Sequence, residues 1–135
     1  MKEELFKRGN DSFTLVEIMI VIAIIGLLTV VTVPSFIRAR QRSQAVTILN
    51  EARILDAAKA QYATENNKPG SLTPDFPDLT PYLKQGTKLA TNGGNDLLGY
   101  PYVMGTISGN LQINTLTKNA LSDSTGGDLF WGPYS

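Results

Sequence analysis

Residues 13–37 read FTLVEIMIVIAIIGLLTVVTVPSFI, and this stretch decides the fold. Glu17 carries its only charge, because no ionisable side chain occurs from Ile18 to Ile37. At a rise of about 1.5 Å per residue, a helix of this length crosses the roughly 30 Å apolar core of a lipid bilayer. The sequence therefore predicts a membrane-spanning helix with a carboxylate near its N-terminal end, where a charge in lipid is costly.

The predicted helix continues beyond the apolar stretch as an amphipathic segment. Apolar residues three and four positions apart mark one helical face: Ala45, Ile48, Leu49, Ala52, Leu55, Ala58 and Tyr62. Charged residues fall mostly on the other faces: Arg42, Glu51, Arg53, Asp56 and Lys59. The turn residues and proline of the segment 66–70 then end the pattern. We therefore expect one helix from about Thr14 to about Glu65.

The stretch FTLVE and the apolar run after it also resemble a family signature. They are similar to the N-terminal segment of type IV prepilins and type II secretion pseudopilins, most like the major pseudopilin. In these families a leader is cut before a Phe or Met, which is then N-methylated, and the fifth mature residue is Glu. The resemblance implies cleavage between Ser12 and Phe13 by a prepilin peptidase and N-methylation of Phe13. Ser12 stands where the family has Gly, and Ser is small enough for the protease subsite.

Glu17 has both a local and an intermolecular interpretation. With Thr14 it makes the pattern of a capping box, and a negative charge is favourable at a helix N-terminus. The resemblance adds an assembly role, in which Glu17 pairs with the α-amine of Phe13 in a neighbouring subunit. Either charge alone would be costly once desolvated.

Gly26 and Pro34 also match positions at which many pilins have glycine and proline, so they are candidate assembly residues. Proline removes a helical hydrogen bond and clashes with the preceding turn. We therefore expect a kink or a locally melted segment between these two residues. The resemblance implies that this segment loosens when subunits assemble.

The remaining chain predicts a small domain, and the fold class is α+β with a pilin-like fold. The expected divisions are a leader over 1–12, a transmembrane half-helix over 13–37 and a periplasmic pilin-like domain over 38–135. Within that domain we expect helix to about 66, a loop over 67–98 with a helical turn near Phe76–Leu83, and a small sheet with a C-terminal loop over 99–135. Tyr100–Met104 and Leu111–Leu116 are the predicted antiparallel strands, packed on the long helix.

The C-terminal residues 120–135 are predicted to be irregular, with Phe130, Trp131 and Tyr134 covering the open end of the core. Within them, Asp123 and Asp128 flank a Gly-containing loop. The resemblance implies a calcium ion here, since calcium accepts carboxylate and carbonyl oxygens. The alternative is a solvated loop in which both aspartates cap turns.

Composition excludes several functions. The chain has no Cys and no His, so it has no disulfide, and a zinc site or His-based catalysis is not expected. We expect no enzyme. The formal net charge is +0, which gives no support for a nucleic-acid partner. Arg38, Arg40 and Arg42 follow the apolar run and either anchor it at the headgroups or pair with acidic residues of the next subunit.

The resemblance implies a structural subunit of a type II secretion pseudopilus. It would lie in the cytoplasmic (inner) membrane as a single-pass protein and polymerise into a helical filament that drives protein export. Its expected partners are copies of itself, other pseudopilins, the prepilin peptidase and a membrane protein of the secretion platform. Two alternatives stay open: a type IV pilus subunit for adhesion, motility or DNA uptake, and a plain single-span membrane protein with a small binding domain.

Overall fold

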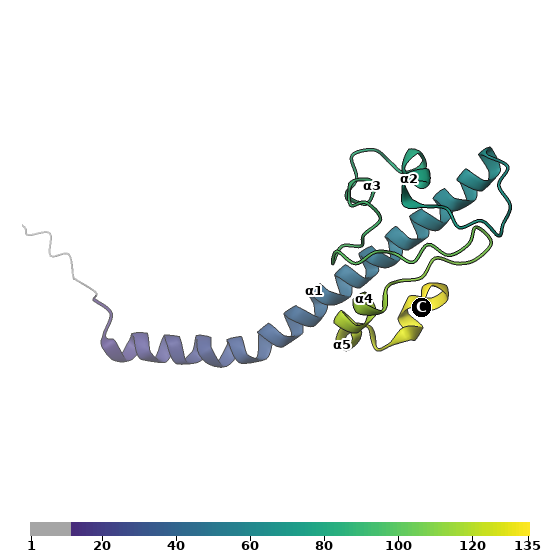
Figure 1. Ribbon diagram of the computed structural model, residues 1–135. Coiled ribbons are helices and arrows are strands. Elements are labelled where there is room, and N and C mark those ends of the chain that lie inside the picture. Colours follow the sequence, from purple (N-terminus) through teal and green to yellow (C-terminus); the bar gives the residue numbers. More distant parts are fainter. Residues whose placement is uncertain (1–11) are drawn as a thin grey trace, which may run out of the picture. The chain divides into compact units, whose positions relative to one another are not determined.

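A computed structural model of the chain describes residues 12–135, so the predicted leader lies outside the described residues except for Ser12. Two compact units divide the chain, one ending at Phe36 and the other spanning Ile37–Ser135. Helix α1 (Leu15–Glu65) contributes to both units (Figure 1), and its bounds confirm the predicted long helix. It is helical throughout, including Pro34, so the locally melted alternative is not observed.

The first unit contributes the apolar part of α1, whose side chains are all exposed. Its most apolar window has a mean hydropathy of 2.8 and contains no buried residue. By length and composition, α1 is the one helix among residues 12–135 that could cross a membrane. The hydroxyls of Thr29, Thr32 and Ser35 donate to carbonyls of the preceding turn, at 2.7 Å to Ile25 O in the case of Thr29. These polar side chains therefore need no hydrogen-bond partner in lipid.

The second unit is built on the remaining part of α1. The predicted apolar face is buried, with Leu49 and Tyr62 partly so. The fully enclosed members are Ala45, Ile48, Ala52, Leu55 and Ala58. The later segments cover this face with Leu79, Leu83, Leu89, Tyr102, Leu111, Ile113, Leu121, Trp131 and Tyr134. Burial of these apolar side chains is the main force holding the loops to the helix.

The C-terminal end of α1 is closed by local hydrogen bonds. Asn67 adopts a left-handed φ of 48°, and Lys68 N donates to Ala63 O at 3.0 Å. The Asn66 side chain donates to Tyr62 O and to the Tyr82 hydroxyl, both at 3.0 Å. These bonds terminate the helix at the position where the turn residues of the segment 66–70 predicted its end.

Six short helices follow α1. They are α2 (Phe76–Leu79), the 3₁₀ helix η1 (Thr80–Tyr82), α3 (Lys88–Thr91), α4 (Thr115–Ala120), α5 (Ser122–Thr125) and the 3₁₀ helix η2 (Asp128–Tyr134). The first two confirm the helical turn expected near Phe76–Leu83. Within the second unit, α2 and α3 lie on one side of α1, and α5 and the C-terminus lie on the other (Figure 1).

The predicted sheet is not confirmed, because residues 12–135 contain no strand. Two isolated antiparallel bridges join Asn95 to Pro101 and Val103 to Gln112. Pro101 has no N–H to donate to a ladder. Beyond Gln112, the Asn114 side chain accepts from Leu116 N at 2.9 Å and starts α4, so the second expected strand turns into a helix.

The C-terminal residues are also more ordered than expected, since α5 and η2 replace the predicted irregular segment. Trp131 is 1% exposed, and Tyr134 is buried beside it in the same core. Phe130 is partly buried and packs edge-on against the Trp131 ring, with centroids 5.0 Å apart. A main-chain hydrogen bond also joins the end of η2 to the segment before α4, because Ile113 N donates to Tyr134 O at 2.9 Å. The prediction that these aromatics cover the core is confirmed.

Candidate functional site

The first turn of α1 contains the predicted capping box. Thr14 N donates to a Glu17 carboxylate oxygen at 2.7 Å, and Glu17 N donates to the Thr14 hydroxyl at 3.2 Å. The two reciprocal bonds satisfy amides that have no partner within the helix. A carboxylate can accept several hydrogen bonds, so the cap leaves Glu17 with capacity for a second partner.

Ser12 and Phe13 lie directly before this cap, outside the helix, and both are exposed. Together with Thr14 and Glu17 they line an open hollow of about 290 Å³. The peptide bond between Ser12 and Phe13 is therefore accessible from solvent and is not engaged in a helical turn. The structure thus brings the predicted cleavage position and the predicted assembly carboxylate to one end of the helix.

Gly26 and Pro34 lie farther along the exposed part of α1. A Cβ built at Gly26 would meet no atom within 4 Å. The fold of the single chain therefore gives no steric reason for a glycine here, although glycine costs about 1 kcal/mol relative to alanine inside a helix. The assembly role of the two residues stays a prediction.

Arg38, Arg40 and Arg42 are exposed at the start of the second unit. Among residues 12–135, the two ion pairs involve other side chains, namely Lys59 with Asp56 and Lys118 with Asp128. The three cations therefore remain available to headgroups or to a neighbouring chain.

Asp123 lies in α5 and Asp128 at the start of η2. Asp128 lies 3.4 Å from the Lys118 ammonium. No group of three or more acidic, His or Cys side chains that could hold a metal occurs within the part of the chain that the structure describes. Calcium takes six to eight oxygen ligands. Main-chain carbonyls can supply calcium ligands as well, so the calcium hypothesis stays a prediction.

Two buried charged residues of the second unit were not predicted from the sequence. Asp96 accepts from Leu98 N at 2.9 Å, from Tyr100 N at 3.0 Å and from the Thr117 hydroxyl. It thereby holds its own loop against α4. Lys59 was expected on a charged face but is 1% exposed. It pairs with Asp56 and donates to Gly109 O at 2.8 Å, so it fastens the loop after Tyr102 to α1.

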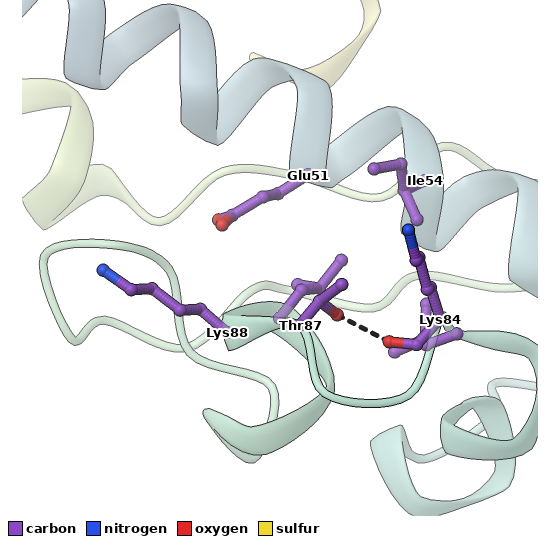
Figure 2. A pocket seen from close by; sticks show the side chains of 7 residues that line it. Glu51, Ile54, Lys84, Thr87 and Lys88 are labelled. Carbon is purple, nitrogen blue, oxygen red and sulfur yellow. Dashed lines mark hydrogen bonds between the residues drawn. The ribbon is translucent and has the colours of Figure 1, made fainter.

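A third unpredicted feature is a pocket of about 250 Å³ between α1 and the segment around α3 (Figure 2). Its lining is mostly apolar and comprises Glu51, Ile54, Leu83, Lys84, Thr87, Lys88 and Leu89. The Tyr102 hydroxyl donates to Glu51 Oε2 at 2.8 Å. Burial raises the pKa of Glu51 above its ordinary value, and the Tyr102 bond partly opposes this shift. Burial and the neighbouring Glu51 together raise the pKa of Tyr102.

The raised pKa of Glu51 predicts a pH dependence of stability. Between the unfolded and folded pKa values, the folded chain keeps a proton that the unfolded chain loses, so stability falls as pH rises from about 4.5. The charges facing Glu51 include Asp96, which adds to the rise, and Lys88, which opposes it.

We expect Glu51→Gln to be at least as stable as the native chain at pH 7, because the amide still accepts from Tyr102 without a buried charge. Its advantage should shrink as pH falls towards 4.5. Urea denaturation of both proteins across this range measures the difference, and a variant that is less stable at pH 7 contradicts the assignment.

Comparison with known proteins finds one family motif and two relatives that each match part of the chain. Residues 7–33 match the signature described as "Prokaryotic N-terminal methylation motif". The chain is 34% identical over 68 residues to the type IV major pilin protein PilA of Myxococcus xanthus, covering 50% of this chain and 31% of that protein. It is 40% identical over 62 residues to the type IV wide pilus major component PilA4 of Thermus thermophilus, covering 44% of this chain and 46% of that one. The matches thus span less than half the length of each relative. No solved structure matches the chain.

The chain thus combines an N-terminal methylation motif with a helix that is long and apolar enough to cross a membrane. The chain carries the N-terminal methylation motif of type IV pilins and pseudopilins, is homologous to type IV major pilins, and fits a pilin-like family.

Proposed function

We propose that this protein is a structural subunit that is processed at its N-terminus and polymerises into a type IV filament. One observation carries the proposal: an accessible Ser12–Phe13 bond within the methylation motif lies beside the apolar part of α1 in the first unit, whose side chains are all exposed. A long unburied apolar surface needs either lipid or other helices around it. In a stored subunit the membrane lipid surrounds this surface, and in a filament the helices of neighbouring subunits surround it.

In this proposal the chain waits as a single-pass protein of the cytoplasmic membrane with its C-terminal domain outside the cytoplasm. A prepilin peptidase cuts between Ser12 and Phe13, and Phe13 is N-methylated. Glu17 keeps its cap and takes the Phe13 amine of a neighbouring subunit as a second partner. The pair supports assembly because two opposite charges offset each other's desolvation.

Mass spectrometry of the mature N-terminal peptide tests the processing step. We expect a peptide that begins with N-methylated Phe13, because the motif and its exposure both favour cleavage at this bond. Ser12→Gly should be processed at least as completely, since glycine fits the same small subsite. A mature peptide that retains Ser12 would overturn the proposed processing, and an unmodified Phe13 would overturn its methylation.

The filament is either a type IV pilus or the related type II secretion pseudopilus. The absence of Cys from the sequence favours the pseudopilus. The names of both relatives, a major pilin and a wide-pilus component, support the pilus, and we take this as the first candidate.

A strain that lacks this protein separates the two functions. We expect it to lose surface filaments when imaged by electron microscopy, while the set of exported proteins stays unchanged. Loss of protein export with surface filaments intact would instead assign the chain to a pseudopilus. Restoring the native gene should reverse whichever defect is found.

A further inference from the structure

The most exposed large apolar side chain of the second unit belongs to Leu129, which is 97% exposed. It lies in η2, whose neighbouring residues Trp131 and Tyr134 are buried in the core. The leucine is therefore held outward by an anchored turn. Asp128 precedes it and keeps a largely exposed carboxylate despite its contact with Lys118. Leu129 and Asp128 together form an apolar knob with an adjacent negative charge.

The pocket beside α3 has the complementary character. Leu83 and Leu89 are buried and Ile54 is half exposed, so its wall is apolar. Lys84 and Lys88 lie on either side of Thr87, and the Thr87 hydroxyl donates to Lys84 O at 2.8 Å (Figure 2). Glu51 carries the one carboxylate of the lining and is engaged by Tyr102. A volume of about 250 Å³ falls below the ~300–1,000 Å³ of small-molecule sites and suits a protein side chain.

The knob and the pocket cannot meet within one chain. Within the second unit, α3 lies on one side of α1 and the C-terminal turn on the opposite side (Figure 1). A contact between them therefore joins two different copies, and a head-to-tail arrangement of the two copies leaves one knob and one pocket free. A head-to-tail contact of this kind builds an open helical assembly when the rotation between copies does not close a ring.

We propose that Leu129 of one copy inserts into the pocket between α1 and α3 of a second copy, with Asp128 placed against Lys84 and Lys88. This inference rests on the proposed filament function and names a contact within the filament. The apolar side chain supplies the desolvated centre, and the opposite charges fix its orientation at the rim.

Disulfide cross-linking tests the contact directly, because the native chain contains no Cys. The full-length double variant Leu129→Cys with Lys84→Cys is expressed as the sole copy, and its filaments are treated with a mild oxidant. We expect a ladder of dimers and higher oligomers on a non-reducing gel, since a disulfide requires Cβ atoms within about 4.5 Å. The matched control is Leu116→Cys with Lys84→Cys, because Leu116 is also exposed (56%) but lies on α4. It and each single variant should stay monomeric.

A second variant pair measures the contribution of the knob to assembly. Leu129→Asp should lower filament yield about tenfold, the effect typical of losing a central interface residue. Leu116→Asp should assemble at the native yield. Both residues are exposed, so resistance to protease should show that both variants are folded.

The outcomes distinguish the contact from the function. The contact is overturned if the native chain forms filaments but the filaments of the double cysteine variant give no ladder. It is also overturned if Leu129→Asp assembles at the native yield. In both cases the filament function stands. A native chain that forms no filament overturns the proposed function, and the contact falls with it.

Discussion

Replacing Glu17 by alanine is expected to leave the protein inserted and folded but to reduce filament assembly by more than about a hundredfold. Loss of the carboxylate half of the cap should cost ~0.5–2 kcal/mol, because Thr14 N loses its acceptor while the bond from residue 17 N to the Thr14 hydroxyl remains. Leaving a neighbour's Phe13 amine desolvated and unpaired should cost ~3–5 kcal/mol. At ~1.4 kcal/mol for each factor of ten, the second cost dominates assembly. Filament yield, measured against the amount of membrane-inserted subunit, checks this.

Two further variants separate the cap from the ion pair. Thr14→Ala removes the hydroxyl acceptor of the capping box but keeps the carboxylate, so filaments should still form. Glu17→Gln keeps a side-chain acceptor for Thr14 N but loses the charge, so assembly should fail as it does for alanine. Native yield from Glu17→Gln would mean that Glu17 serves only as a cap.

Trp131→Ala is expected to be the most damaging single change to the stability of the second unit. The ring is 1% exposed, and truncating a buried aromatic side chain typically costs ~3–5 kcal/mol. The edge-on contact with Phe130 adds to this loss. Urea denaturation of the full-length protein in detergent, followed by circular dichroism, measures the change.

Leu129→Ala provides the matched control from the same turn. Its side chain is 97% exposed, so the free energy of unfolding should change by less than about 0.5 kcal/mol. A loss similar to that of Trp131→Ala would contradict the view that Leu129 acts only between molecules.

The long helix was predictable from the sequence because its signals are local and repeated. An uninterrupted apolar run continues into residues spaced three and four apart, and the structure buries the predicted members, from Ala45 to Ala58. The capping box of Thr14 and Glu17 was predictable for the same reason, since both partners lie within one turn.

Local sequence patterns could not predict that residues 12–135 form bridges instead of a sheet, or that a pocket lies beside α3. The alternation after Leu111 is weak, and the Asn114 cap redirects the chain into α4. The pocket joins Glu51 to Lys88 across residues distant in sequence. Lys59 was placed on a charged face because periodicity cannot show that its ammonium will donate a hydrogen bond to a distant carbonyl, Gly109 O.

The absence of strands from residues 12–135 has a consequence for how copies recognise one another. A free strand edge presents main-chain donors and acceptors that any other edge can match, whatever its sequence. The described part of this chain offers bridges and short helices instead. Neighbours must therefore be selected through side chains, one position at a time. In the proposed filament, the choice of neighbour can then change by single substitutions, without any change of backbone.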